Sequence, residues 1–576
     1  MDPQPKISNR HSLLCLSALA IVCFAVMLPV LIKGVPVGHD LPHHYQCAMT
    51  YVESIRSGDL YPSWSLNRNF GYGGMETRLY PPLSHYTLAL FYLAAGDWHI
   101  ATWLTVLFFT FIGSFGVYLW AREYVEPRQA VFAGCIFAIL PYHLNQIYNT
   151  FFFAEYAGSA ILPFTFVYIS RVCRRGKPGD ALGLGISFAA LILTHLPLTV
   201  IGSISFLIYG LLKLRRDRWF SQTFGLAAGV LLGLAASSFF WVKVLQERDL
   251  MAKALVYADP WLDYNLHFLI TPLQHFEPGT QLTVYENATL YYDLTFLCAV
   301  AIAVAFGLGF VTSARERLRD SRAVIAVFLI ACFLITPASI LLWRYLPVLQ
   351  EVQFPWRWLV IVSITASVIA ARNVDTVLGW YRTSRRPFAL IITGCLGAVI
   401  TFSISQIIRP AAFMPTTEVE ATIGKQASEE GFTFWWPIWA REEAFKIRER
   451  VLAGTRAVRV DRWNATEREF EVSPGEAGDV RVATFYHPNW TAEIDGRAAL
   501  INQTADGAML VPVSANQSVV RLVFAESYWV QLARSISLFT WLSLLTTALI
   551  FSLARSWKKL RIGGRLRLNE PLLEHD

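Results

Sequence analysis

Long apolar segments, separated by short polar and basic stretches, run along most of the chain. Many of them approach the roughly 20 residues that a transmembrane helix requires. Because lipid offers no hydrogen bonds to the backbone, this pattern predicts an α-helical polytopic membrane protein. We expect about twelve transmembrane helices, at approximately residues 12–33, 98–120, 129–147, 156–170, 181–196, 198–213, 222–243, 291–312, 323–342, 357–371, 388–408 and 532–554.

Clusters of arginine and lysine between the apolar segments orient the predicted helices. They occupy residues 171–177, 213–218, 315–322, 372–386 and 555–567. Cytoplasmic loops are enriched in positive charge, and twelve spans with a cytoplasmic N-terminus put every cluster on that side. Both termini are then cytoplasmic, and the outward loops are 34–97, 143–155, 244–290, 343–356 and 409–531. The short apolar segment 84–96 is expected to be re-entrant or interfacial, because one more span would break this agreement.

A different pattern begins after the eleventh predicted span. From about residue 455 to 527, short strand-like runs alternate with turn residues such as Asp495-Gly496 and Asp506-Gly507. This pattern predicts a small extracytoplasmic β-sandwich, which either stabilises the protein or binds a glycan or acceptor. The predicted organisation is a transmembrane module with its external loop 34–97, a β-rich domain, a final helix and a basic cytoplasmic tail, over residues 1–408, 409–531, 532–554 and 555–576.

Composition supports the membrane assignment. Of the 576 residues, 54% are hydrophobic and only 16% are charged, whereas soluble domains have about 25% charged residues. The net charge of +7 does not indicate a nucleic-acid partner, because the basic residues lie in the loop clusters. The eight cysteines are scattered singly, so neither a disulfide framework nor a zinc-binding spacing is predicted.

The most unusual polar stretch is VPVGHDLPHHY, residues 35–45, directly after the first predicted helix. Its carboxylate, Asp40, could act as a general base on an acceptor hydroxyl or help to hold a divalent cation such as Mg²⁺ or Mn²⁺. The alternative is a helix cap or a loop carboxylate bonded to backbone amides. Pro42 predicts an extended local backbone. The neighbouring His39, His43 and His44 are candidate substrate contacts.

A second acidic candidate is Glu155, at the outward end of the fourth predicted span. A carboxylate at membrane depth is costly unless it is paired or functional. Glu155 is therefore either a second acid near Asp40 or the partner of an arginine. In LQEVQFPWRWL, residues 349–359, Gln353 and Arg357 could bind a phosphate, since a guanidinium group can fork two phosphate oxygens. The alternative for this string is an interfacial Trp/Arg anchor.

Further candidates come from the first predicted external loop and from a helix end. The stretch 58–86 is rich in aromatic residues and glycine, and it offers Arg78 for a phosphate and Tyr80 and His85 for substrate contacts. The alternative is an interfacial aromatic belt. His195 is a candidate substrate contact or, alternatively, a histidine satisfied at a helix end.

Several of these strings resemble known families. The strings GHDLPHHY, YPSW…GYGG…YPPLSHY and QFPWR resemble bacterial membrane proteins called "6-pyruvoyl-tetrahydropterin synthase-related" and the YfhO-like membrane proteins. FYHPNWTAEIDGR is similar to the C-terminal domain of the YfhO-like group. The lone aspartate after the first helix, the many spans and the C-terminal β-domain resemble the GT-C superfamily of polytopic membrane glycosyltransferases.

The resemblance implies sugar transfer from a polyprenyl-phosphate-linked donor to a cell-envelope glycan, lipid or protein, outside a bacterial inner membrane. The superfamily's catalytic aspartate corresponds to Asp40, and its second acidic position to Glu155. The second external loop has no Asp-x-Asp or Glu-Asp pair like that of metal-dependent members. The resemblance therefore implies no required cofactor, and a divalent metal, Mg²⁺ or Mn²⁺, stays an open alternative. The alternatives are a transporter or flippase of lipid-linked glycans and a non-catalytic subunit of a polysaccharide assembly complex. Nearly uncharged mid-span regions and the lack of a repeat disfavour a transporter.

Overall fold

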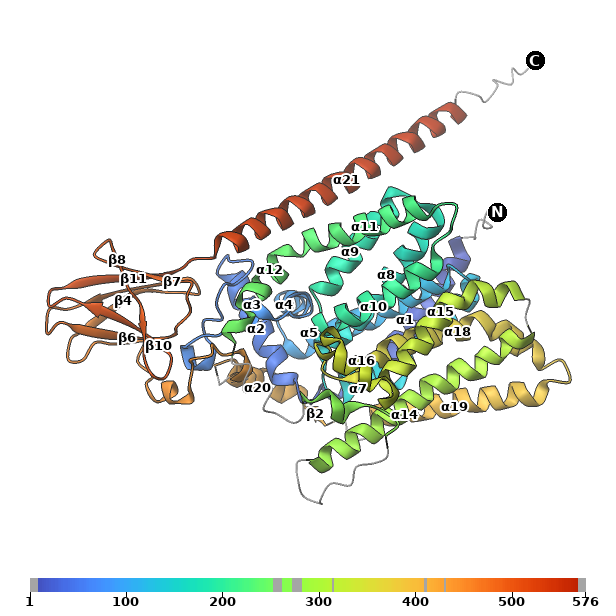
Figure 1. The fold of residues 1–576 in the computed structure, drawn as a ribbon, viewed down its shortest axis with the longest axis horizontal. Coiled ribbons are helices and arrows are strands. Elements are labelled where there is room, and N and C mark those ends of the chain that lie inside the picture. Colours follow the sequence, from blue (N-terminus) through green and yellow to red (C-terminus); the bar gives the residue numbers. More distant parts are fainter. Residues whose placement is uncertain are drawn as a thin grey trace, which may run out of the picture.

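The computed structural model describes residues 9–251, 262–271, 282–312, 315–408, 412–428, 431 and 433–567. Parts of the predicted outward loop 244–290 and the last residues of the predicted basic tail lie outside these ranges. The described chain is mostly helical, with a region of β-sheet near its C-terminus (Figure 1).

Within the described residues, seven helices are long and apolar enough to cross a membrane. Their apolar stretches are Leu13–Lys33, Trp98–Ala121, Leu196–Lys213, Trp219–Ala236, Leu290–Val311, Pro355–Trp380 and Arg386–Ser405. They lie on α1 (Asn9–Lys33), α5 (Trp98–Ala121), α10 (Leu196–Lys213), α11 (Trp219–Ala236), α14 (Leu282–Gly307) with η5 (Leu308–Thr312), η7 (Pro355–Trp358) with α18 (Leu359–Trp380), and α19 (Arg386–Ile408). The prediction of a polytopic helical protein agrees with this set.

The predicted number of twelve spans is not reproduced by this count, and proline is one physical reason. Helices α6 (Pro127–Ile139) and α7 (Pro141–Tyr148) meet at 40°, and α15 (Arg315–Ile335) meets the helical segment from Pro337 at 91°. Proline removes a backbone donor and restricts the residue before it. If each bent pair is one span, the described residues contain up to nine. The predicted spans 156–170 and 532–554 are helical, on α8 (Phe153–Arg175) and α21 (Tyr528–Arg567), and the span 181–196 is helical as far as the end of α9 (Pro178–Ile192). None of these three helices is among the nine.

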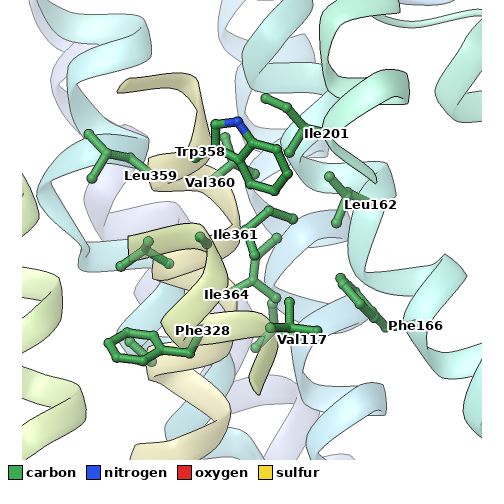
Figure 2. Packing of buried hydrophobic residues seen from close by; sticks show 14 of the residues in the cluster. Val117, Leu162, Phe166, Ile201, Phe328, Trp358, Leu359, Val360, Ile361 and Ile364 are labelled. Atoms are coloured by element: carbon green, nitrogen blue, oxygen red, sulfur yellow. The ribbon is translucent and has the colours of Figure 1, made fainter. Parts of the chain in front are cut away.

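Helix α18 is the centre of the bundle. In the span that contains it, 83% of the most apolar window is buried, against 22–56% in the other six. A helix that is apolar on all sides is stable where neighbours surround it. Figure 2 shows Ile361 and Ile364 of α18 packed among side chains from four other helices. These side chains are Val117 of α5, Leu162 and Phe166 of α8, Ile201 of α10 and Phe328 of α15. The QFPWR string therefore enters the most enclosed helix of the protein.

The C-terminal region contains two antiparallel sheets. One has the order β3 (Val451–Leu452), β6 (Gly478–Phe485), β10 (Ala508–Val513), β9 (Asn502–Gln503), and the other the order β4 (Val458–Trp463), β5 (Glu467–Val472), β11 (Ser518–Phe524), β7 (Trp490–Ile494), β8 (Arg497–Ala499). Buried and exposed residues alternate along β5 and β11, as expected for strands with one face on a core. Asp495 and Gly496 both have positive φ at the β7–β8 turn, which agrees with the predicted turn residues. The predicted β-rich region is confirmed.

Loop 34–97 lies between the helices and this β-region. Its first residues form β1 (Val35–Pro36), which pairs with β2 (Phe413–Met414) beyond α19. It continues through α2 (Leu41–Arg56), the short α3 (Glu76–Leu79) and α4 (Leu83–Ala95), which covers the segment predicted to be re-entrant or interfacial. Trp64, Tyr72, Met75 and Leu79 belong to the hydrophobic cluster of the β-region. The loop that carries most candidate residues is thus held by packing on two sides.

Candidate active site

Asp40 stands where the chain turns from β1 into α2. A side chain on Gly38 would place its Cβ 2.4 Å from the carbonyl carbon of Thr150, so glycine permits this close approach. The backbone N–H of Asp40 donates to the carbonyl oxygen of Thr150 at 3.4 Å. The expectation of an extended backbone before Pro42 is wrong, because α2 begins at Leu41 and Pro42 lies in its first turn. Proline is tolerated there, since the first N–H groups of a helix have no internal acceptor.

The carboxylate of Asp40 is not used as a helix cap. Although Asp40 occupies the N-cap position of α2, its side chain accepts no hydrogen bond from the helix. Among the described residues its partner is the Nδ1 atom of His39, at 2.8 Å. The Asp40 side chain keeps 34% of its surface exposed. The carboxylate is therefore open to a ligand, and the capping alternative does not describe it.

Behind Asp40, a cluster of aromatic side chains contains the other histidines of this motif. Nδ1 of His44 lies 2.9 Å from Nε2 of His85, and the ring of His43 stacks on Trp435 with 5.7 Å between centroids. Tyr80 packs edge-on against His43 at 4.9 Å. Burial and the nearby His85 lower the pKa of both His43 and His44 well below the ordinary value, so both imidazoles are neutral.

Glu155 and Arg357 form a buried ion pair. Nε of Arg357 donates to Oε2 of Glu155 at 2.9 Å, and Nη1 of Arg357 donates to the side-chain oxygen of Gln353 at 3.0 Å and to the carbonyl oxygen of Val352 at 2.7 Å. Gln353 has a φ of 67°, a left-handed conformation that costs free energy for a non-glycine residue. Of the two readings of Glu155, the arginine-paired one matches the structure.

Two residues that bind Glu155 were not predicted from the sequence. Nε2 of Gln146 donates to Oε1 of Glu155 at 3.0 Å, and the hydroxyl of Tyr142 donates to the same oxygen. Tyr142 and Gln146 are four residues apart on α7, a spacing that places them on one helix face. This spacing is the feature of the sequence that could have identified the two residues. It does so only when Glu155 is known to lie beside α7.

The Asp40 and Glu155 groups share one electrostatic environment. Burial raises the pKa of Tyr80, the charges of Asp40 and Glu155 raise it further, and the charge of Arg357 opposes them. His195 caps α10 by accepting a hydrogen bond from the N–H of Leu198 at 3.3 Å. This hydrogen bond matches the alternative in which His195 is satisfied at a helix end. His195 nevertheless lies near the histidine cluster, because its charge contributes to the lowered pKa of His44. The structure therefore brings the predicted site residues together, with one exception.

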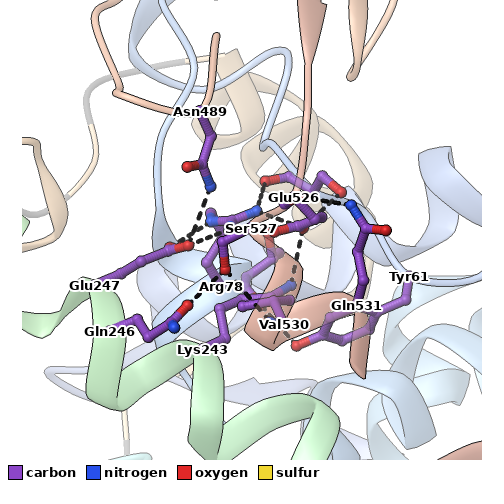
Figure 3. A network of polar contacts seen from close by, with 12 residues as sticks. Tyr61, Arg78, Lys243, Gln246, Glu247, Asn489, Glu526, Ser527, Val530 and Gln531 are labelled. Atoms are coloured by element: carbon purple, nitrogen blue, oxygen red, sulfur yellow. Dashed lines mark hydrogen bonds and ion pairs between the residues drawn. The ribbon is translucent and has the colours of Figure 1, made fainter. Parts of the chain in front are cut away.

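The exception is Arg78, which lies in a separate network (Figure 3). Its guanidinium group is fully buried and bonds two carboxylates, Glu247 and Glu526. Nε donates to Glu247 at 2.6 Å, Nη1 to Glu526 and to the carbonyl oxygen of Ser63, both at 2.9 Å, and Nη2 to Glu526 at 2.8 Å and to Glu247. All five N–H groups of the guanidinium are thus used. The predicted phosphate contact of Arg78 does not fit this arrangement.

The Arg78 network joins three distant parts of the chain. Glu247 ends α12 (Ser238–Glu247), and Glu526 precedes α21 directly after the β-region. Nζ of Lys243 lies 3.3 Å from Glu526. Burial alone would raise the pKa of Glu526, but its hydrogen bonds to Arg78 and the positive charges of Arg78 and Lys243 lower it to about 2. We call this network the Arg78 joint.

The described residues contain no group of three or more His, Cys, Asp or Glu side chains arranged to hold a metal ion. The imidazoles of His43, His44 and His85 contact one another and aromatic rings. Asp40 supplies one open carboxylate beside them.

A family described as "6-pyruvoyl-tetrahydropterin synthase related domain; membrane protein" matches residues 77–410, more than half of the chain. The resemblance to this family that the sequence motifs indicate is confirmed. No curated protein matches the chain.

Several solved structures resemble the chain at low identity. The arabinofuranosyltransferase AftD from Mycobacteria is 15% identical with a TM-score of 0.44, over 70% of this chain and 27% of that one. The Archaeoglobus fulgidus oligosaccharyltransferase tethered with an acceptor peptide is 14% identical with a TM-score of 0.44, over 75% and 60%. ArnT from Cupriavidus metallidurans bound to undecaprenyl phosphate is 14% identical with a TM-score of 0.34, over 65% and 80%. The chain matches only about a quarter of the mycobacterial protein's length, and TM-scores below 0.5 support no conclusion about function.

Replacing Arg78 should destabilise the protein strongly. Arg78→Met leaves the buried carboxylate of Glu247 without its cation and Glu526 with Lys243 alone, which costs about 3–5 kcal/mol. Arg78→Lys should cost less because it keeps the charge. Thermal unfolding in detergent would measure both. The matched control is Arg459→Lys, at an exposed ion pair of the β-region, which should leave the melting temperature unchanged. Equal melting temperatures for Arg78→Met and the wild type would contradict the role of the joint.

The Arg78 joint should also make stability depend on acid. Because the folded-state pKa of Glu526 lies near 2, below its ordinary value of 4.5, its contribution is complete above about pH 4.5 and is lost as the pH falls toward 2. The full contribution is on the order of 3 kcal/mol. The unfolding free energy of the wild type should therefore fall more steeply between pH 5 and 3 than that of Glu526→Gln. Glu493→Gln, at an exposed position on β7, should retain the wild-type slope.

Proposed function

The chain belongs to the membrane-protein family of the 6-pyruvoyl-tetrahydropterin synthase related domain, and from this premise we propose that it is a membrane glycosyltransferase. The donor is a sugar linked to a polyprenyl phosphate, and the acceptor is a cell-envelope glycan, lipid or protein. In this proposal the chain crosses a bacterial inner membrane about twelve times, with both termini cytoplasmic. The site and the β-region, which forms a β-sandwich in this proposal, face outward. This orientation follows from the basic clusters, which lie in the loops on the opposite, cytoplasmic side.

The observation that carries the proposal is the open carboxylate of Asp40 at the start of α2. Asp40 accepts the proton of the acceptor hydroxyl, whose oxygen then attacks the anomeric carbon of the donor sugar. The bond between that carbon and the phosphate oxygen breaks, and the lipid phosphate leaves with the electron pair. A phosphate is a stable anion, so its departure needs positive charge and hydrogen bonds but no proton donor.

Arg357 is the cation that the geometry favours for the phosphate. Its Nε and Nη1 atoms are bonded to protein oxygens, whereas its Nη2 atom donates to none among the described residues. Its side chain also keeps 10% of its surface exposed, in contrast to the fully buried Arg78. Glu155 then acts as a positioning residue that fixes the guanidinium plane, instead of the second acid that the superfamily resemblance implies.

The neutral histidines suit the sugar hydroxyls. Nε2 of His44 is buried and has no hydrogen-bond partner among the described residues. A buried polar atom without a partner costs free energy, and a ligand hydroxyl would satisfy it. The rings of His43, His85 and Tyr80 contact the ring of His44, and such aromatic surface suits the apolar face of a sugar ring. In this proposal these residues orient donor or acceptor.

The central prediction is that Asp40→Asn abolishes transfer without affecting folding. Asparagine keeps the shape of the side chain but cannot accept the hydroxyl proton, and the loss of a general base typically costs 10²–10⁴-fold in rate. Purified protein in lipid would be incubated with a panel of polyprenyl-phosphate sugars, and release of free lipid phosphate would be measured with Mg²⁺, with Mn²⁺ and with a chelator.

The control for Asp40→Asn is Asp59→Asn, a second carboxylate of the same loop that accepts a hydrogen bond from the N–H of Tyr61. It should retain full activity. Release of lipid phosphate at the wild-type rate by Asp40→Asn would refute the base assignment. If the wild type releases no lipid phosphate from any donor, a transporter or an assembly subunit replaces the enzyme as the leading function.

A second prediction concerns the lipid phosphate. Arg357→Lys keeps a cation beside Glu155 but lacks the free Nη2 group, so one charge-assisted hydrogen bond to the phosphate is lost. Such a bond contributes about 1.5–3 kcal/mol, so the inhibition constant of undecaprenyl phosphate in the transfer assay should rise about tenfold or more. Arg78→Lys serves as the comparison, and it should change stability but not this constant. The opposite pattern would assign the phosphate to Arg78.

A further inference from the structure

A second candidate site lies on loop 34–97, away from Asp40. A hollow of about 540 Å³, open to solvent, is lined by Asn67, Phe70, Gly71 and Arg448. Ligand-binding clefts usually measure about 300–1,000 Å³. The wall comes from two distant segments, the glycine-rich turn of loop 34–97 and the chain just before β3. No step of the proposed transfer chemistry uses these residues.

The turn that forms the hollow is rigid and strained. Asn69 and Phe70 have φ of 53° and 57°, in the left-handed region that side chains other than glycine and asparagine rarely adopt. Asn69 is fully buried, and its side-chain oxygen accepts hydrogen bonds from the N–H of Gly431 at 2.8 Å and from Nε1 of Trp436 at 3.0 Å. This anchor fixes the turn so that Phe70 keeps 37% of its surface exposed. An aromatic side chain held outward at a conformational cost needs a compensating role.

Arg448 completes the hollow with a cation. Its guanidinium carbon lies 3.7 Å from the centroid of the Phe70 ring. Arg448 is exposed and makes no hydrogen bond or ion pair within the part of the chain that the structure describes. Stacking on an aromatic ring holds a guanidinium plane in place while its N–H groups remain free to fork a carboxylate or phosphate. Beside it, Nδ2 of Asn67 donates to Glu53 at 2.8 Å, which leaves the amide oxygen for a hydroxyl.

The hollow is connected to the Asp40 site through two adjacent tryptophans. Trp435 stacks on His43, inside the site, and Trp436 bonds Asn69, at the base of the turn. The side chain of Arg68, the residue before Asn69, donates to Gln46 of α2, the helix that begins directly after Asp40. A long substrate could therefore reach Asp40 with one end while another part lies over Phe70.

We propose that this hollow is an acceptor subsite for an acidic glycan, an oligosaccharide that carries carboxylate or phosphate groups. Arg448 binds the anionic group, Asn67 accepts a hydrogen bond from a sugar hydroxyl, and Phe70 offers apolar surface to the ring. The assignment to the acceptor side rests on the proposed transferase function. Binding of an acidic glycan at Arg448 can be measured without any transfer.

The test is isothermal titration of the full chain in lipid nanodiscs with three probes. Tetragalacturonate carries carboxylates, maltotetraose with a terminal phosphate carries a phosphate, and unmodified maltotetraose is neutral. At least one charged probe should bind more tightly than the neutral one, and the better of the two identifies the anionic group. Arg448→Gln should weaken that binding about tenfold or more, and Arg448→Lys should weaken it less because it keeps the charge.

Matched variants separate the subsite from general effects. Phe70→Asn removes the aromatic ring but suits the left-handed backbone, so it should fold normally and weaken binding several-fold. Arg450→Gln changes an exposed arginine two residues from Arg448 that does not line the hollow, and it should bind like the wild type.

Three results would overturn the subsite: binding of the charged probes that is independent of Arg448 and Phe70, equal binding of charged and neutral probes, or no binding at all. The two proposals fail separately. Loss of transfer in Asp40→Asn together with Arg448-independent binding refutes the subsite and keeps the enzyme. Arg448-dependent binding without any detectable transfer keeps the glycan site and refutes the enzyme.

Discussion

The buried charge of Arg78 imposes the strongest constraint on the structure. A guanidinium group without solvent contact is stable only if carboxylates and carbonyl oxygens replace the lost water. Here two carboxylates and one carbonyl oxygen use all five N–H groups, and they come from α12, from the connection between β11 and α21, and from loop 34–97. If any one of these parts moves, a buried charge loses its partner. The joint therefore fixes the β-region relative to the helices.

The candidate site depends on this constraint because Tyr80 follows Arg78 by two residues. The other end of the same loop is held by the β1–β2 pair and by the contact of Gly38 with Thr150. Between these two attachments, α2 carries His43 and His44, which are buried among aromatic rings. A carboxylate at the start of a helix would normally cap it. At Asp40 the surrounding attachments hold the turn in place, and the carboxylate is not needed for that purpose.

Local patterns in the sequence predicted the helical membrane region, the β-region and the neighbourhood of Asp40, because each depends on residues close together in the chain. The pairings of charges could not be predicted in the same way. Arg357 and Glu155 are 202 residues apart, and Arg78 and Glu247 are 169 apart, so their contacts arise only from the tertiary fold. The number of spans could not be predicted from the hydrophobic pattern either, because a proline in an apolar segment is compatible with both a kinked span and two separate helices. Likewise, two adjacent histidines cannot share one helix face, but both are buried where neighbours surround α2.

The distribution of partners among the charged residues separates structural groups from functional ones more clearly than their sequence context does. Arg78 and Arg357 both follow aromatic or glycine-rich motifs, and both were equally good phosphate candidates. The structure gives Arg78 an acceptor for every N–H group, but leaves Nη2 of Arg357 without one among the described residues. The same comparison distinguishes the two acids, since Glu155 accepts three side-chain hydrogen bonds and Asp40 accepts one, from an exposed histidine. A substrate can bind strongly only to groups whose hydrogen-bonding capacity the protein has not already used. In this region, that condition is met by Asp40, Arg357 and His44, the three groups to which the proposed function gives substrate contacts.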